Sequence, residues 1–311
     1  MRLVFFGTPD FAVPSLQALL TAGHDVAAVI TQPDKARGRS RSRLVPPPVK
    51  TVAADLGITV LQPQKPLGDV FLQSLRHLDA ELGIVVAYGH LLNPAVLATP
   101  TLGMINVHAS LLPRLRGAAP IPWAILNGEP ETGISIMQME AGLDSGPVYQ
   151  RVSTPIGPEE TGGELTARLA QIGADALVQT LEALSAGRIR AEAQDASAAT
   201  FAPKIHRDLC RIRWDEPALV CARRVRAFDP DPAAWTTLKQ TEVKLFGGRV
   251  QEAPPPGPDP AGTVIQTGAR LSIATGDGAL LIREVQPAGK RRMPAADWVR
   301  GRGVAVGDRF A

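Results

Sequence analysis

The sequence predicts an α/β protein, with a mostly parallel sheet covered by helices and then a small β-barrel. Residues 1–188 alternate apolar strand-like runs with helical stretches, and several runs are apolar at nearly every position, which suits strands covered on both faces. After residue 206 the runs become short and are separated by Gly and Pro, a spacing typical of a small barrel. We therefore expect domains at 1–188 and 207–311, joined by a polar linker at 189–206.

Two helices frame the first domain. The first should run from about Asp10 to Ala22, because Pro14 is tolerated only near a first turn and Gly23 can take the left-handed conformation that ends a helix. The last starts after Thr161, which forms a T-x-x-E capping box with Glu164 and is followed by apolar residues at helical spacing as far as Gly187. The expected strands are Leu3–Phe6, Val26–Thr31, Ile58–Gln62, Leu82–Tyr88, Met104–His108 and Gly133–Met139.

The second domain should contain one short helix, at Pro217–Ala227. The segment Ala253–Pro260 is too rich in proline for a strand, and we expect an exposed loop there. The expected strands are Val243–Phe246, Gly262–Gln266, Arg270–Ala274 and Ala279–Val285.

The bulk composition excludes several classes of protein. The 311 residues are 45% hydrophobic and 20% charged, which is enough for a sizeable core, and the apolar runs are far too short to cross a membrane. The first residues resemble a strand rather than a signal peptide. Cys210 and Cys221 are too few for a disulfide framework or a thiolate zinc site, so we expect a cytoplasmic protein.

Positive charge is concentrated in two places. Residues 201–311 carry 18 Lys and Arg against 12 Asp and Glu, whereas residues 1–200 carry 15 against 18. Within the first part, residues 31–50 hold six basic side chains and one acid. A polyanion that touches both places would explain this distribution, and two ordinary solvated surfaces are the alternative.

The strand Met104–His108 carries the chemical signal. Side chains alternate along a strand, so Asn106 and His108 share one face at its end. Burying both is costly unless they are satisfied or used, and a satisfied core pair is the alternative. The turn after the first strand lacks G-x-G-x-x-G, and the chain lacks G-x-x-x-x-G-K-[ST], which argues against a dinucleotide site and a P-loop.

Asn106–Gly117 (NVHASLLPRLRG) and, about 30 residues later, Gly142–Gly146 (GLDSG) together resemble the signature of the folate-dependent formyltransferases. Matching blocks at Phe6–Ala12, Thr31–Asp34, Thr132–Glu140 and Gln286–Met293 extend the resemblance over essentially the whole chain. It implies a Rossmann-like catalytic domain with Asn106, His108 and Asp144 as its catalytic residues, and an OB-like second domain.

These residue types suit the attack of an amine on a formamide carbonyl. Asn106 and His108 can both donate to the developing oxyanion, where one donor is typically worth ~3–4 kcal/mol. Asp144 can hold His108 as a cation and relay the proton of the amine. The reaction requires neither a metal nor a covalent nucleophile.

The resemblance also implies the binding sites. The formyl donor would be 10-formyltetrahydrofolate, and the acceptor would be initiator methionyl-tRNA, reached through a basic inserted loop at about 34–49 and through the C-terminal domain. The implied folate contacts are Val86, Ala87, Tyr88, Gly89, Ser110, Leu111, Leu112, Pro113, Gly142 and Leu143. The implied tRNA contacts are Arg37, Arg39, Arg41, Arg43, Lys290, Arg291 and Arg292.

Two departures and two alternatives remain. Ala36 stands where the family usually has proline, and the acids of Asp229–Pro232 weaken any claim that this turn touches phosphate. A formyltransferase acting on a sugar nucleotide or another small amine is the first alternative, and a non-catalytic tRNA-binding protein is the second. No obligate protein partner is evident, and we expect a monomer.

Overall fold

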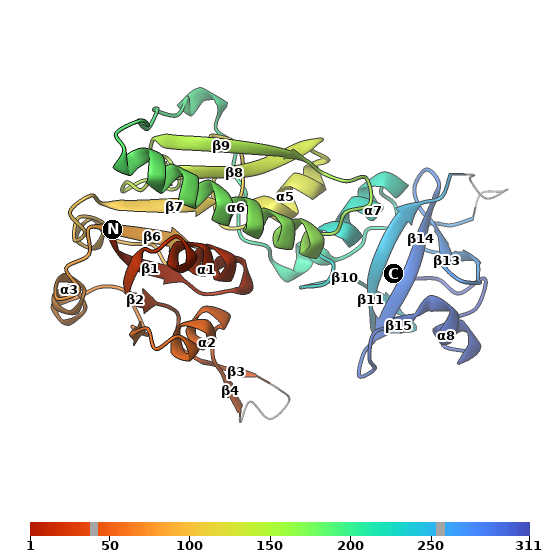
Figure 1. Cartoon of the computed structure of the whole chain (residues 1–311). Helices are drawn as coiled ribbons and strands as arrows, with labels where there is room; N and C mark the ends of the chain where they lie inside the picture. The colour runs from red at the N-terminus through yellow and green to blue at the C-terminus, as the bar shows by residue number, and fades with distance from the viewer. Residues whose placement is uncertain (38–42, 253–258) are drawn as a thin grey trace. The chain divides into compact units, whose positions relative to one another are not determined.

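The computed structural model describes residues 1–37, 43–252 and 259–311 (Figure 1). Residue contacts group these residues into two compact units. One contains residues 1–120, 131–154 and 166–203, and the other contains 121–130, 155–165 and 204–311. The second unit therefore includes two short segments that lie in the sequence between parts of the first unit.

The first unit is built on a seven-stranded sheet of order β5-β2-β1-β6-β7-β8-β9. Strands β5, β2, β1, β6 and β7 are parallel, and β8 is antiparallel to β7, so the expected mostly parallel sheet is confirmed. The strands span Arg2–Gly7 (β1), Asp25–Ile30 (β2), Val60–Leu61 (β5), Leu82–Val86 (β6), Met104–His108 (β7), Glu131–Gln138 (β8) and Val148–Pro155 (β9). Strand β9 is missing from the expected set because its residues alternate between partly buried and exposed, unlike the continuous apolar runs of the other strands.

The chain reverses its direction of travel across the sheet between β1 and β6. It leaves β1 toward β2 and β5, and then returns to β6 on the other side of β1. Open α/β sheets bind ligands beyond the carboxyl ends of strands at such a switch point. The loops that follow β1, β6 and β7 are therefore the place to look for a site.

Helices α1 (Val13–Thr21) and α6 (Gly162–Ser185) cover one face of this sheet (Figure 1). Side chains of both helices line a shared groove. Gly173 of α6 lies so close to Val107 that an added Cβ would be 2.9 Å from the valine Cγ1. Thr161 and Glu164 exchange hydrogen bonds as the capping box predicts, and Gly187 has the expected positive φ of 65°. Helices η1 (Asp10–Ala12), α2 (Pro48–Asp55), α3 (Asp69–Arg76) and α4 (Pro94–Leu97) also belong to this unit, whereas α5 (Pro120–Asn127) belongs to the second unit from Ile121 onward.

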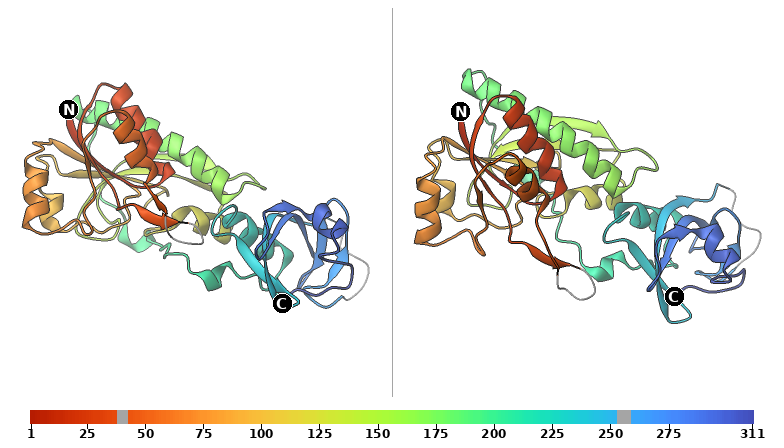
Figure 2. Two further views of the ribbon diagram at one scale, coloured as in Figure 1. Left: turned by 90° about the horizontal axis from the view of Figure 1, so that it is seen from below. Right: turned by 60° about the horizontal axis from the view of Figure 1, so that its bottom comes forward.

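The basic segment forms a β-hairpin where it is described. Strand β3 (Lys35–Arg37) pairs with β4 (Arg43–Val45) in antiparallel register, and the hairpin extends away from the sheet (Figures 1 and 2). Residues 38–42, which include Arg39 and Arg41, lie outside the described residues. The expected loop at 34–49 thus has two short paired strands at its base.

The second unit is an antiparallel sheet of order β10-β11-β14-β13-β12, with β15 paired to β14. At the chain end, Phe310 forms a bridge with Leu238 and Arg309 forms a bridge with Thr263, so the last residues join the two edge strands and the expected barrel-like fold is confirmed. The elements of the second unit are η3 (Arg207–Cys210), α7 (Ala218–Ala227), β10 (Ala234–Leu238), β11 (Thr241–Val250), β12 (Val264–Gln266), β13 (Leu271–Ala274), β14 (Ala279–Pro287), β15 (Met293–Pro294) and α8 (Ala295–Arg300). The short helix η2 (Ala196–Ala198) precedes them in the chain and belongs to the first unit.

The elements expected for the second unit were incomplete, and part of its expected proline-rich loop lies outside the described residues. The helix expected at Pro217–Ala227 is α7, with Pro217 as its N-cap, whereas β10, β15 and α8 were not expected. Residues 253–258 of the expected proline-rich loop are not described, and Asp259 and Pro260 are exposed. Among the described residues of the whole chain, no helix is long and apolar enough to cross a membrane.

Candidate active site

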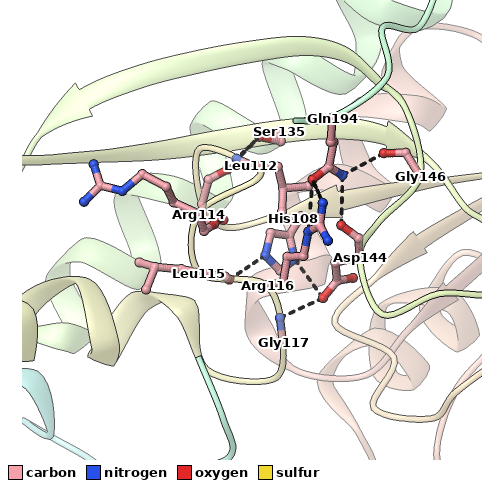
Figure 3. A network of polar contacts seen from close by, with 11 residues as sticks. His108, Leu112, Arg114, Leu115, Arg116, Gly117, Ser135, Asp144, Gly146 and Gln194 are labelled. Carbon is pink, nitrogen blue, oxygen red and sulfur yellow. Dashed lines mark hydrogen bonds and ion pairs between the residues drawn. The ribbon is translucent and has the colours of Figure 1, made fainter. Parts of the chain in front are cut away.

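His108 is the last residue of β7, and only 6% of its side chain is exposed. Its Nε2 lies 3.1 Å from the carbonyl oxygen of Leu115, and because a carbonyl can only accept, Nε2 must be the donor. Its Nδ1 faces Asp144, 3.8 Å from Oδ2 (Figure 3). An acceptor at one nitrogen and a carboxylate near the other suit an imidazolium, in which both nitrogens carry a proton.

Asp144 lies in the loop between β8 and β9, and it reaches the loop after β7 as well as His108. Its Oδ2 accepts a hydrogen bond of 2.9 Å from the main-chain nitrogen of Gly117. Its φ of 47° is uncommon for a residue other than glycine. Because β8 lies beside β7 in the sheet, the two motifs that are about 30 residues apart in the sequence meet at one corner.

Asn106 stands two residues before His108 on β7, partly exposed. The close packing of Val107 on α6 directs the alternate residues Asn106 and His108 to the other face of the sheet. With the described residues the Asn106 side chain forms no hydrogen bond. Its amide is therefore available to a ligand.

The loop Ser110–Pro113 is expected to contact the formyl donor. Hydrogen bonds from side chains of the neighbouring strands β8 and β9 fix its main chain. The Ser135 hydroxyl donates to the Ser110 carbonyl at 2.7 Å and accepts from the Leu112 nitrogen at 3.0 Å. Arg151 donates to the Leu112 carbonyl at 2.6 Å, and the Leu112 side chain is buried. In this loop, Leu111 and Pro113 are the residues that are partly exposed.

The loop after β6 is the second expected folate segment. Val86 and Tyr88 are buried, whereas Ala87 and Gly89 are exposed and have positive φ angles of 46° and 85°. Burial raises the pKa of Tyr88 to about 12, so its phenol stays neutral and serves packing. A ligand beside this loop would meet main chain rather than large side chains.

The third expected folate segment is the loop that carries Asp144. Gly142 and Leu143 are exposed, Leu143 by 51%. A Cβ added to Gly142 would lie 2.0 Å from the Ser145 hydroxyl oxygen, so only glycine fits this turn without a rearrangement.

A chain of hydrogen bonds connects the loop after β6 to the base of the hairpin. The side-chain amide of Gln32 donates to the Tyr88 carbonyl at 3.1 Å. The main-chain carbonyl of Gln32 accepts from the Gln62 side chain at 2.9 Å. Gln62 also donates to Asp34 at 2.8 Å, and Lys50 forms an ion pair with Asp34 at 2.8 Å. Hydrogen bonds from Gln62 and then Lys50 hold the pKa of Asp34 below its ordinary value.

Gln194 is a part of the corner that the sequence did not reveal. It lies in the segment expected to be a linker, and it donates to the carbonyls of Asp144 at 2.9 Å and Gly146 at 2.7 Å (Figure 3). It accepts from Arg116, whose side chain is buried. Its position in a weakly periodic polar stretch carries no signal of this role, because its partners are far away in the sequence.

The three basic residues expected near residue 290 differ from one another. The Arg292 guanidinium contacts two carboxylates, Asp229 at 3.0 Å and Glu284 at 2.7 Å, and lies 4.0 Å from the centre of the Phe246 ring. Lys290 and Arg291 are exposed. The structure thus accounts for the acid at 229, which is 5% exposed and forms an ion pair with Arg292.

Two other kinds of reactive group are potential metal ligands and cysteine thiols. Over residues 1–37, 43–252 and 259–311, no three His, Cys, Asp or Glu side chains are grouped to hold a metal ion. Cys210 and Cys221 are buried in the other unit, and burial raises the pKa of their thiols to about 11 and about 12.

Comparison with known proteins places these features in a family. The family model described as formyl transferase matches residues 1–181, and the model described as formyl transferase, C-terminal domain, matches residues 204–303. The chain is 46% identical over 309 residues to a protein of Moorella thermoacetica named methionyl-tRNA formyltransferase, covering 99% of this chain and 98% of that protein.

Solved structures share the fold at low sequence identity. HypX from Aquifex aeolicus in complex with tetrahydrofolic acid matches with a TM-score of 0.68 and 18% identity over 99% of this chain, which spans about half (48%) of that protein. An N-formyltransferase from Helicobacter canadensis, in complex with folinic acid and dTDP-3-aminofucose, matches with a TM-score of 0.68 and 16% identity over 94% of this chain and 99% of its own.

Proposed function

The chain belongs to the formyl transferase family, and we propose that it transfers the formyl group of 10-formyltetrahydrofolate to the amino group of initiator methionyl-tRNA. The product would be N-formylmethionyl-tRNA for translation initiation, made in the cytoplasm by a monomer. The observation that carries the proposal is the contact of His108 with Asp144 at the end of β7, with Asn106 two residues earlier on the same strand, in a chain that is similar over its whole length to a protein named for this activity.

Asn106 and His108 stabilise the oxyanion by different means. The Asn106 amide donates a hydrogen bond directly to the formyl oxygen as it gains charge. The Nε2 proton of His108 is directed at the Leu115 carbonyl, so the imidazolium acts through its positive charge unless that bond is exchanged for one to the oxyanion. This refines the expectation that both residues donate in the same way.

Asp144 holds the cation and handles the proton of the amine. With Oδ2 3.8 Å from Nδ1 of His108 and 2.9 Å from the Gly117 nitrogen, its carboxylate is oriented on two sides. The attacking amine must lose a proton, and the leaving nitrogen of the folate must gain one. A carboxylate at this corner can accept the first proton and relay it, as a general base does.

The donor and acceptor contacts follow the segments already described. The loop after β6 and the loop that carries Asp144 offer main chain to the pterin, and partly exposed residues of Ser110–Pro113 line the formyl group. The arginines of the hairpin, together with Lys290 and Arg291, hold phosphates of the tRNA. Arg292 is left out of this set because it is engaged with Asp229 and Glu284.

The test is a reaction of the purified protein with 10-formyltetrahydrofolate and charged initiator tRNA. We expect tetrahydrofolate release only with the charged tRNA, and formyl-methionine after hydrolysis of the ester bond. Uncharged tRNA is the matched control. Turnover of an amino-sugar nucleotide without any turnover of the charged tRNA would support the sugar-directed alternative instead, and binding of tRNA without turnover would support the non-catalytic one.

A further inference from the structure

Gln194 uses its whole hydrogen-bonding capacity at the candidate site. Its two N–H groups point to the carbonyls of Asp144 and Gly146, and its oxygen receives Nε and Nη2 of Arg116 at 3.1 and 2.7 Å (Figure 3). The two sides of the amide therefore face partners of opposite kind. Carbonyls can only accept and a guanidinium can only donate, so chemistry fixes the orientation of the amide.

The segment around Gln194 is fastened to both loops of the corner. Glu192 pairs with Val148 through two main-chain hydrogen bonds of 2.8 and 2.9 Å, just beyond the loop that carries Asp144. Further along, the Thr200 carbonyl accepts from the Arg116 nitrogen at 2.8 Å, and the Thr200 hydroxyl accepts from the Leu115 nitrogen at 2.9 Å. Gln194 therefore sits on a braced main chain and not on a free connection.

These contacts close a ring around the catalytic pair. His108 donates to the Leu115 carbonyl, Gly117 donates to the Asp144 carboxylate, and Arg116 between them donates to Gln194. Gln194 returns to the Asp144 main chain. Asp144 has a positive φ, which costs energy for a non-glycine residue and persists only where neighbours enforce it.

We infer that Gln194 is a positioning residue that holds Asp144 in the conformation from which its carboxylate faces His108. The inference rests on the proposed roles of these two residues in formyl transfer. Arg116 supports Gln194 in turn, and the braced segment 192–202 is a wall of the active site.

The first test compares Gln194→Met with Gln150→Met. Methionine keeps the length of the side chain and removes all four hydrogen bonds of Gln194. We expect kcat to fall about 10- to 100-fold, because small displacements of catalytic groups cost rate on this scale, with KM for both substrates nearly unchanged. Gln150 also loses a buried partner, the Thr180 hydroxyl at 2.8 Å, but this partner is on α6 and not on the loop of Asp144, so the Gln150 variant should keep wild-type kcat.

Gln194→Glu separates the two sides of the amide. The glutamate still accepts from Arg116, but it has no donor for the two carbonyls and places negative charge beside them. We expect kcat to fall at least as far as in Gln194→Met. A wild-type rate in Gln194→Glu would mean that only the Arg116 side matters, and it would overturn the inference.

The second test is a double-mutant cycle with Asp144→Asn. If Gln194 acts through Asp144, then Gln194→Met should change the residual rate of Asp144→Asn less than twofold. The inference would be overturned if the double variant lost rate by the product of the two single losses. It would also be overturned if Gln194→Met had the rate of the wild type. The rate compared is formyl transfer to whichever amine the wild type accepts, so an inactive wild type with charged tRNA refutes the proposed function separately.

Discussion

The corner around His108 and the base of the β3–β4 hairpin are both held by polar side chains, but to different degrees. At the corner, buried groups are held from several sides, through Leu115, Gly117, Gln194 and Arg116. At the hairpin base, Asp34 is held by Gln62 and Lys50 and is partly exposed. Bond-making chemistry needs a fixed geometry, whereas phosphate recognition tolerates a change in position, since a phosphate carries its charge over several oxygens.

The largest effect should come from Asp144→Asn. The variant keeps the size of the side chain and its contact with Gly117, but it loses the charge that faces His108 and the ability to take a proton. We expect kcat to fall by about 10²–10⁴-fold, the range for a general acid–base group. Folate affinity, measured by fluorescence quenching, should stay near that of the wild type.

The exposed Asp175, which accepts a hydrogen bond from Gln171 on α6, offers a matched control. Asp175→Asn should leave kcat unchanged. A near-normal rate in Asp144→Asn would remove the catalytic half of the comparison.

A smaller and different effect should come from changing Arg37, Arg39, Arg41 and Arg43 together to Ala. We expect KM for charged tRNA to rise and its salt dependence to weaken by up to about one unit of slope for each lost phosphate contact. Folate affinity should not change. The measurement is kcat/KM for charged tRNA between low and moderate salt.

Unaltered kinetics in the four-arginine variant would show that the hairpin plays no part in choosing the acceptor. A loss of folate affinity would show that the two regions are not separable.

The smallest effect should come from Asp34→Asn at the hairpin base. The amide can still accept from Gln62 but no longer pairs as an ion with Lys50. We expect a rise in KM for charged tRNA of only about twofold to fivefold, because a partly exposed ion pair contributes little. An equal loss of kcat would instead connect the base to the chemistry, through Gln32 and Tyr88.

The pH dependence of this contact has a definite sign. The pKa of Asp34 is held below its ordinary value, so the carboxylate is the form that the folded state favours. The stabilising effect is present above the ordinary Asp pKa and is lost as pH falls through the lowered value. KM for charged tRNA should therefore be insensitive to this group at neutral pH.

Local patterns predicted the parts of the fold that local energetics determine. Strand β7 has the bounds expected from its apolar run, and Thr161 and Glu164 form the expected capping box at the start of α6. The meeting of His108 with Asp144 was available from the sequence only through the family resemblance. Spacing alone left a satisfied core pair as an alternative to a catalytic pair.

Features that depend on distant partners could not be predicted in this way. Gln194 meets residues 48 to 78 positions away, and a polar stretch contains no sign of such partners. Arg292 is basic and lies in a basic run, yet its charge is taken up by Asp229 and Glu284. The bridges that Arg309 and Phe310 form with the edges of the barrel also connect residues far apart in the sequence, so they could not be predicted either.

The most direct test of the division between chemistry and acceptor choice is a single-turnover rate of formyl transfer, measured by rapid quenching with enzyme and both substrates at saturation. We expect a rate near that of the wild type for the four-arginine variant and a rate lower by about 10²-fold or more for Asp144→Asn. Loss of the single-turnover rate in the four-arginine variant, or an unchanged rate in Asp144→Asn, would show that chemistry and acceptor choice are not divided between these two regions.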